Sequence, residues 1–471
     1  MGTIKVQNVN RFIAKAYLFL LTIRMISPLV GPTAVLHGIS TYFDLFLHIL
    51  GLVLAIISSG GKLYLGDRES SRLFRLFVKI VIWFVISSII MSVVIQLTYG
   101  NYAGESAFSG VIGQITYYIH YALIILYNIY VFKILSKDEI DRILGVECVF
   151  LLILGYYQIL CYVVGGIFKT FGNTVDIFSV LFPGEGMLKL SLTATEGAKA
   201  GGICAVLVLP YLFSKVLSGV RSRKYYLQII LWIPVVISMQ STSAYLMIFA
   251  EVMGFFYFLS KSGNRQRSKF WQMLLLVLLI GSFAILFIPD YYMNSVFNKD
   301  AISYLIFSKI SDSNNGSTMM RTAPLIINWK VFLRFPIFGV GNGLQGYFYT
   351  EFFPQEALSV PGVMNLYSVA HNTIVNGALF FPSILSGYGI VGTTFVCIYI
   401  FRMFRVIESK KRNLGIFYMM FKIALVGIVV HGFQTEFAGS YFIWFVLSIP
   451  FMPADHEGAI FDCKKVLGEI L

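Results

Sequence analysis

The stretch FVKIVIWFVISSIIMSVVIQL, residues 77–97, indicates the fold class of this chain. Lys79 is its only charged residue, and its 21 residues suffice for a helix to cross about 30 Å of hydrocarbon. A bilayer offers no water to backbone N–H and C=O groups, so the stretch must satisfy these groups within a helix. We therefore expect residues 77–97 to form a transmembrane helix.

Comparable stretches recur along the whole chain. The predicted spans are 12–30, 41–59, 77–97, 116–135, 146–168, 198–214, 225–239, 243–260, 270–288, 387–404, 415–431 and 437–453. Hydrophobic residues make up 57% of the chain and charged residues 13%, about half the share of ~25% that is usual in soluble domains. The sequence predicts an all-α, polytopic integral membrane protein with about twelve transmembrane helices, and residues 1–471 are expected to form a single membrane domain.

Basic residues give these predicted helices a direction in the membrane. The formal net charge is +13. The short segments rich in Lys and Arg are 62–79, 133–142, 215–224, 261–269 and 402–412. The alternate short segments that hold neither residue are 98–115, 240–242 and 432–436. Cytoplasmic loops carry such an excess of positive charge, so both termini are predicted to be cytoplasmic, and the charge does not indicate a nucleic-acid partner.

Two predicted outer segments are long, 169–197 and 289–386. A loop of about a hundred residues is too long to be a passive connection, so the second segment is expected to have structure of its own. Apolar residues from Arg321 to Phe335 follow the spacing of a helix, which Pro336 should end. We expect an amphipathic helix that lies against the outer membrane face.

Cations in the outer segments are candidates for binding an anionic lipid headgroup. Arg321 and Arg334 lie in the larger segment, and Lys189 lies in the smaller one. Arginine binds phosphate oxygens through two parallel hydrogen bonds, which suits a diphosphate. After the predicted helix, Pro336 is followed by glycines at alternate positions, among them Gly341. These glycines either allow a ligand to approach the backbone closely or belong to an ordinary loop.

His371, Asn372 and Glu196 are further candidates. Histidine titrates near neutral pH and is suited to acid–base catalysis, although a lone histidine can also be structural. No second His or acidic residue stands at metal-ligand spacing beside His371, so the sequence predicts no zinc site and no cofactor. Glu196 lies close to a predicted span, where a carboxylate is costly and often functional. With Thr193 it also fits a capping box, and this alternative stays open.

Two more ionisable residues lie at predicted outer ends of spans. Glu436 follows the span 415–431, where it either faces the same pocket or is an exposed loop carboxylate. Arg24 lies near the outer end of the first span, where it either lines the pocket or extends its charged group towards the membrane surface.

The order of these motifs resembles that of the O-antigen polymerase and ligase superfamily (Wzy and WaaL type). The shared features are an Arg that opens an amphipathic helix containing Trp, then Pro-x-x-Gly-x-Gly-x-Gly, then Ala-His-Asn before a late span, all in the largest outer loop. In this chain they are Arg321, Trp329, Pro336, Gly339, Gly341, Gly343, Ala370, His371 and Asn372. The resemblance extends over about residues 185–440.

The resemblance implies a membrane glycosyltransferase of the GT-C type in the bacterial cytoplasmic membrane. It would polymerise undecaprenyl-diphosphate-linked oligosaccharide units, as donor and acceptor, into O-antigen or capsule on the outer, periplasmic face. Arg321 would bind the diphosphate with support from Arg334 and Lys189, and His371 or Glu196 would orient or deprotonate the acceptor hydroxyl without a metal. The residues expected to contribute to the pocket are Asn372, Gly341, Glu436 and Arg24.

Partners and alternatives follow from the same resemblance. Membrane lipids, a chain-length regulator and a flippase are the implied partners. A ligase that transfers the glycan to another acceptor is an alternative within the superfamily. A transporter of lipid-linked sugars is an alternative from another class, although transporters place charged sites in broken helices at mid-bilayer. The large outer loop of this chain favours chemistry over transport.

Overall fold

The computed structural model describes most of the chain as helix. The described residues are 2–22, 48–60, 63–164, 190, 192, 197–219, 223–239, 241–261, 316–360, 363–375, 377–437, 440–453 and 460–461. Apart from one antiparallel pair of two-residue strands, Leu63–Tyr64 (β1) with Ile460–Phe461 (β2), the regular elements of this part are helical. The predicted all-α class is therefore confirmed for the described residues.

The helices of the N-terminal half are α1 (Gly2–Phe19), His48–Ser58, α3 (Arg68–Tyr99), α4 (Ala107–Ile134), α5 (Lys137–Val164), α7 (Gly197–Ile203), the π-helix η2 (Cys204–Val208), α8 (Leu209–Leu217), α9 (Arg223–Ser238) and α10 (Thr242–Lys261). Those of the C-terminal half are α14 (Gly316–Arg334), η4 (Gln345–Phe348), α15 (Tyr349–Phe352), η5 (Gln355–Ser359), α16 (Val363–Asn372), α17 (Phe380–Ser409), α18 (Lys411–Leu414), α19 (Ile416–Gly432), α20 (Tyr441–Ser448) and η6 (Ile449–Phe451).

Six of the described helices are long and apolar enough to cross a membrane. They are Arg68–Tyr99, Ala107–Ile134, Lys137–Leu160, Ala198–Leu217, Thr242–Lys261 and Phe380–Ser409. Three shorter apolar helices, His48–Ser58, Ile416–Gly432 and Tyr441–Phe451, coincide with other predicted spans. The predicted span 270–288 lies outside the described residues. The part of the chain that the structure describes thus contains six candidate membrane spans, which supports a multi-pass membrane protein.

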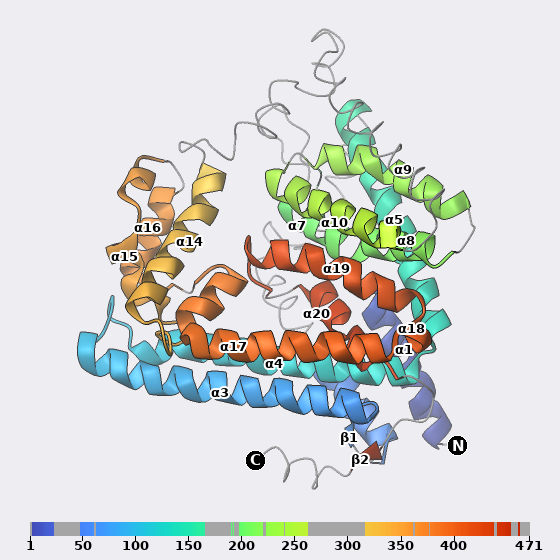
Figure 1. Ribbon diagram of the computed structural model, residues 1–471, viewed down its shortest axis with the longest axis horizontal. Coiled ribbons are helices and arrows are strands. Elements are labelled where there is room, and N and C mark those ends of the chain that lie inside the picture. The colour runs from blue at the N-terminus through green and yellow to red at the C-terminus, as the bar shows by residue number, and fades with distance from the viewer. Residues whose placement is uncertain are drawn as a thin grey trace.

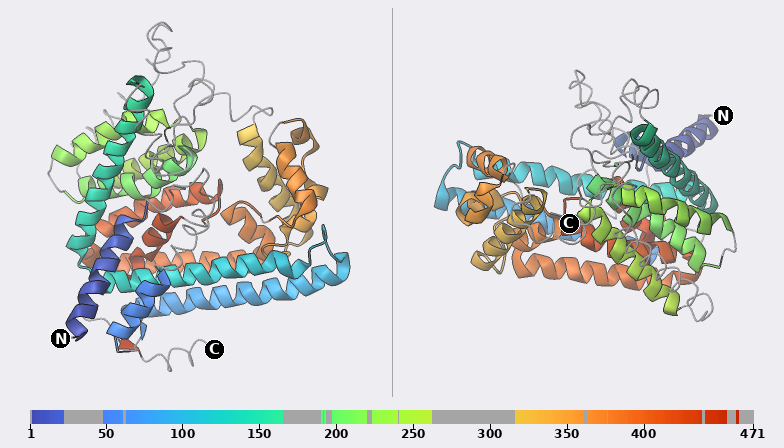
Figure 2. Two further views of the ribbon diagram at one scale, coloured as in Figure 1. Left: turned by 180° about the vertical axis from the view of Figure 1, so that it is seen from behind. Right: turned by 90° about the horizontal axis from the view of Figure 1, so that it is seen from above.

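The long helices α3, α4 and α17 run side by side, and one end of this group carries the segment 316–375, which we call the outer lobe (Figure 1). The N-terminus lies at the opposite end of the molecule in all three views (Figures 1 and 2). The outer lobe binds the loop between α3 and α4: the Tyr102 hydroxyl donates to the Ala370 carbonyl at 2.7 Å, and the Tyr347 hydroxyl donates to the Gly100 carbonyl at 3.0 Å.

The segments that are rich in basic residues lie together at the end of the molecule opposite the outer lobe. Lys410 lies 2.6 Å from a carboxylate oxygen of Asp67, and Arg11 and Lys15 both pair with Glu139, at 2.7 and 2.9 Å. The ends of α17, α3, α1 and α5 thus meet on one side of the molecule. This grouping agrees with the predicted sidedness, because each of these segments was assigned to the same face from its basic residues.

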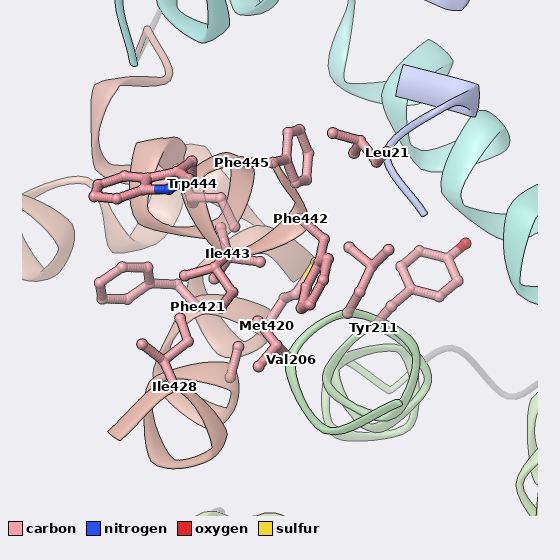
Figure 3. Close-up of a cluster of buried hydrophobic side chains, with 14 of the residues drawn as sticks. Leu21, Val206, Tyr211, Met420, Phe421, Ile428, Phe442, Ile443, Trp444 and Phe445 are labelled. Atoms are coloured by element: carbon pink, nitrogen blue, oxygen red, sulfur yellow. The ribbon is translucent and has the colours of Figure 1, made fainter. Parts of the chain in front are cut away.

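The buried core of the bundle lies where the helix formed by α7, η2 and α8 packs against α19 and α20. Figure 3 shows Val206 and Tyr211 from the first group facing Met420 and Phe442 from the second. Gly427 allows this close packing, since a Cβ there would lie 2.7 Å from the Ala205 carbonyl oxygen. The packing fixes the end of α19 next to the start of α7.

The glycine-rich loop joins the outer lobe to the bundle. Gly341 N–H donates to the Gly387 carbonyl at 2.7 Å, and Ile390 N–H donates to the Pro336 carbonyl at 2.8 Å. These bonds replace those that α17 lacks at Gly389, where φ is +60° and the helix is broken. A Cβ on Gly339 or Gly343 would overlap with backbone atoms of Gly387 or Gly110, respectively. The glycines therefore allow backbone to pack against backbone.

Buried polar side chains reinforce this junction. Asn342 donates to the Tyr118 hydroxyl at 2.6 Å, and Gln345 donates to the Asn342 side-chain oxygen at 2.9 Å. Ser386 donates to the Asn328 side-chain oxygen at 2.5 Å, which joins α17 to α14. A buried polar group that loses its partner costs about 1–3 kcal/mol, so the network favours one arrangement of the lobe on the bundle.

Substitution of Gly343 by Ala should destabilise the protein more than the same substitution at Gly104. Both residues have positive φ, +93° and +81°, but a Cβ at Gly104 would meet no atom within 4 Å. The shared backbone strain costs about 1–2 kcal/mol, and overlap at Gly343 should add about 1–3 kcal/mol. Melting temperatures of the two purified variants in detergent measure the difference, and equal shifts would contradict the proposed close packing.

Candidate functional site

A cleft forms where four segments of the chain meet. The residues that line it are Ala198, Lys199, Ser243, Met247, Arg321, His431, Gln434 and Thr435. They come from the start of α7, the start of α10, α14 and the end of α19. From its basic-residue pattern, the sequence assigns each of these ends to the outer side. The cleft is small, with a volume of about 50 Å³.

Among the predicted site residues that the structure describes, Arg321 alone lines this cleft. It lies on α14, which begins at Gly316 and ends at Arg334, so the predicted helix before Pro336 is confirmed. One face of α14 buries Ala323, Ile327 and Val331, and this packing directs Arg321, which is half-buried, towards the bundle. Lys199 adds a second, half-buried cation from α7. Two cations in one cleft form a suitable site for a phosphate-bearing ligand.

His371 and Asn372 do not line the cleft. Both are exposed on the last turn of α16 in the outer lobe. The imidazole of His371 packs edge-on against Tyr367 with ring centroids 4.6 Å apart, and its Nδ1 lies 3.4 Å from the Tyr367 carbonyl oxygen. The structure thus places His371 on a different element and a different surface from Arg321.

Arg334 lies at the opposite end of α14 from Arg321. Thirteen residues separate them, a rise of about 20 Å along a helix. Arg334 pairs with Glu351 at 2.7 Å and donates to the Tyr99 hydroxyl at 3.2 Å. The structure does not bring the two arginines to one phosphate group, and the predicted support from Arg334 would require this ion pair to open.

Gly341 and Glu436 do not line the cleft. Gly341 is buried in the loop that packs on α17, so the structure gives it a role in joining lobe and bundle. Glu436 follows Thr435 of the cleft, and burial raises the pKa of its carboxyl above the usual value. Glu436 is therefore a half-buried carboxyl, and the alternative expectation of an exposed loop carboxylate is wrong.

The remaining predicted site residues are Glu196, Lys189 and Arg24, and they lie outside the described residues. The same holds for most of the predicted outer segment 169–197 and for the first part of 289–386. Glu196 directly precedes Gly197, the first residue of α7. Its place in the sequence is thus three residues before Lys199 of the cleft.

An apolar groove adjoins the cleft. Two neighbouring cavities of about 410 and 330 Å³ share walls formed by Phe381, Ile384, Val396, Ile400 and Val429. Leu325, one turn along α14 from Arg321, lines the groove, and so does Phe433, which directly precedes Gln434 of the cleft. Along α17 the groove extends from Thr393 to Phe404, a rise of about 15 Å. A cationic cleft next to an apolar groove matches an amphiphile with an anionic head.

Lys199 and His431 were not predicted as site residues. Both are ionisable and lie at predicted outer ends of spans, so their positions in the sequence indicated that each was a candidate. His431 is 2% exposed, and its Nδ1 lies 3.1 Å from the sulfur of Met247. Within the described part of the chain, no three His, Cys, Asp or Glu residues are arranged to hold a metal ion.

Residues 228–397 match the family model described as O-antigen ligase. The match covers little more than a third of the chain. This finding confirms the resemblance to the O-antigen polymerase and ligase superfamily that the motif order indicated. No curated protein matches the chain.

The O-antigen ligase segment contains Arg321, the glycine-rich loop and His371. Lys199, His431 and Glu436 lie outside it. The cleft therefore combines three residues of the matched segment, Ser243, Met247 and Arg321, with Lys199 from α7 and polar groups from the end of α19. These findings support a coarse assignment as a multi-pass membrane protein with a segment similar to the O-antigen ligase family.

Glu436 should make the stability of this protein depend on pH. Its raised folded-state pKa means that the folded protein binds more protons than the unfolded one between the two pKa values, so stability falls as pH rises through that window. Glu436→Gln should remove this fall. Melting temperatures measured from pH 4 to pH 8 test the effect, and curves that stay parallel in wild type and variant would contradict it.

Proposed function

We propose that this protein is a membrane glycosyltransferase that polymerises undecaprenyl-diphosphate-linked oligosaccharide units on the outer face of the bacterial cytoplasmic membrane. One observation carries the proposal: a cleft with Arg321 and Lys199 opens beside an apolar groove of the membrane bundle. The diphosphate would bind to the cations and part of the prenyl chain would lie in the groove. The match of residues 228–397 to the O-antigen ligase family model supports a lipid-linked sugar substrate.

The proposed reaction needs little beyond orientation and charge stabilisation. A sugar hydroxyl of one lipid-linked unit attacks the anomeric carbon of another, and undecaprenyl diphosphate leaves with the electron pair of the broken C–O bond. Cations that stabilise the growing charge on the diphosphate lower the barrier, so we propose that no metal takes part. His371 and Asn372, exposed on the outer lobe, are proposed to contact the acceptor glycan, with Glu196 and Lys189 contributing from the segment before α7.

The proposed topology has about twelve spans in one polytopic GT-C-like domain, both termini inside, and 169–197 and 289–386 outside. Arg24 and Glu436 are proposed to line the outer rim of the site. A flippase that delivers the lipid-linked units and a chain-length regulator are the proposed partners. The grouping of basic segments at one end, and of the cleft and outer lobe towards the other, supports this sidedness.

A ligase is the second candidate, because the matched family is described as O-antigen ligase. Its chemistry would be the same, but the attacking hydroxyl would belong to another acceptor. A purified protein given only lipid-linked repeat units should lengthen the glycan if it is a polymerase. A single transfer to an added acceptor, without lengthening, would assign it as a ligase.

Arg321→Lys should reduce polymer formation about 10–100-fold, since a lysine loses the paired hydrogen bonds to phosphate and such charged bonds contribute about 1.5–3 kcal/mol. Polymer is measured in cells that lack the native copy, with the amount of inserted protein matched. Lys330→Gln on the same helix is the control, because Lys330 is exposed and does not line the cleft. Full polymer from Arg321→Lys would remove this residue from the diphosphate site.

Cysteine labelling should place the outer lobe outside. A cysteine introduced at Ser368, exposed on α16, should react with a membrane-impermeant maleimide in intact cells. A cysteine at Arg412, exposed on α18, should react only after the cells are opened. The reverse pattern would overturn the proposed orientation.

A further inference from the structure

His431 is a buried histidine with one ring nitrogen still available. Its side chain lines the cleft together with Arg321 and Lys199, yet it is only 2% exposed. Among the described residues, Nε2 has no hydrogen-bond partner. Buried polar atoms normally have partners, so an unpartnered nitrogen in a cleft indicates a position that a ligand atom can occupy.

The neighbour of the other ring nitrogen sets the tautomer of His431. Nδ1 lies 3.1 Å from the sulfur of Met247 on α10. A thioether sulfur can only accept a hydrogen bond, so Nδ1 carries the hydrogen in the neutral ring. Nε2 then holds a lone pair. In this tautomer the unpartnered nitrogen is a proton acceptor, the form that a general base requires.

The helices around His431 hold its ring in place. Gly202 on α7 leaves room for the imidazole, because a Cβ there would lie 2.7 Å from Cε1. Phe437 stacks on the other side with ring centroids 6.0 Å apart. One turn deeper, a carboxylate oxygen of Glu251 on α10 accepts from Gly427 N–H of α19 at 3.1 Å. These contacts fix α19 against α7 and α10 and fix the direction of Nε2.

We propose that His431 is a catalytic residue, the base that takes the proton of the attacking sugar hydroxyl; this inference rests on the proposed glycosyl transfer. The O–H bond breaks and its proton moves to Nε2, while the hydroxyl oxygen forms the new bond to the anomeric carbon. The anomeric C–O bond to the diphosphate breaks, and its electron pair leaves with the diphosphate. His431 later releases the proton to water. Met247 is the positioning residue that keeps the lone pair on Nε2.

The test separates donor binding from turnover. Full-length protein is purified into lipid nanodiscs, and binding is measured with undecaprenyl diphosphate. Turnover is measured with lipid extracted from cells that lack this chain and therefore accumulate its lipid-linked substrate. His431→Gln should bind undecaprenyl diphosphate like the wild type, but its turnover should fall about 10²–10⁴-fold, the usual contribution of a general base. His120→Gln, a ring-contacting histidine on α4 outside the cleft, is the control and should turn over normally.

A pH profile distinguishes catalysis from packing. The charged groups on the segments that pack around His431 include Lys199 on α7, Arg321 on α14, Glu251 on α10 and Glu436 after α19. Wild-type turnover should rise with pH through one ionisation, and His431→Gln should lack this rise. Met247→Leu keeps the apolar volume but removes the sulfur acceptor, so it should lower turnover about tenfold and shift the rise. Because this variant preserves packing, it keeps the test decisive if His431→Gln is unstable.

Two outcomes overturn the inference in different ways. Normal turnover and an unchanged pH profile in His431→Gln or Met247→Leu would remove His431 from the reaction, while the proposed function would stand. Wild-type protein that neither binds undecaprenyl diphosphate nor converts the extracted lipid would overturn the proposed function, and the role of His431 with it.

Discussion

Backbone packing of the glycine-rich loop against the break in α17 is the constraint on which the rest of the structure depends. Across this junction Gly341 N–H donates to the Gly387 carbonyl and Ile390 N–H donates to the Pro336 carbonyl, and the positive φ of Gly389 breaks the helix there. A side chain at Gly339 or Gly389 would hold the two backbones apart. The junction therefore anchors the C-terminal end of α14 at the bundle, and the direction of α14 carries Arg321 into the cleft.

The break in α17 also has consequences for the membrane. The part after Gly389 is a continuous apolar helix, whereas the part before it, from Phe380, turns away and supplies Phe381 and Ile384 to the groove. A single irregular residue thus divides α17 into two segments, and both segments line the groove. Irregular backbone at this depth is tolerated because protein groups, here the carbonyls of Pro336 and Ile337, satisfy its N–H groups.

The cleft and the groove differ in polarity but share elements. On α14, Arg321 lines the cleft and Leu325 lines the groove. At the end of α19, Gln434 lines the cleft and Phe433 lines the groove. A substrate with a charged head and a hydrocarbon chain would contact both at once. Such an arrangement would keep the reacting sugar at the membrane surface, because the chain in the groove limits how far the head can move.

The sequence by itself determined the membrane fold, since runs such as 77–97 can satisfy their backbone only as helices, and helices occur at all of the predicted spans that the structure describes. It also determined the helix that ends before Pro336, and Arg321 as a cleft residue. Only the tertiary structure decided which polar groups meet. His431 joined the cleft and His371 did not, because the packing of α19 on α7 and α10, between residues far apart in sequence, sets where each ring lies.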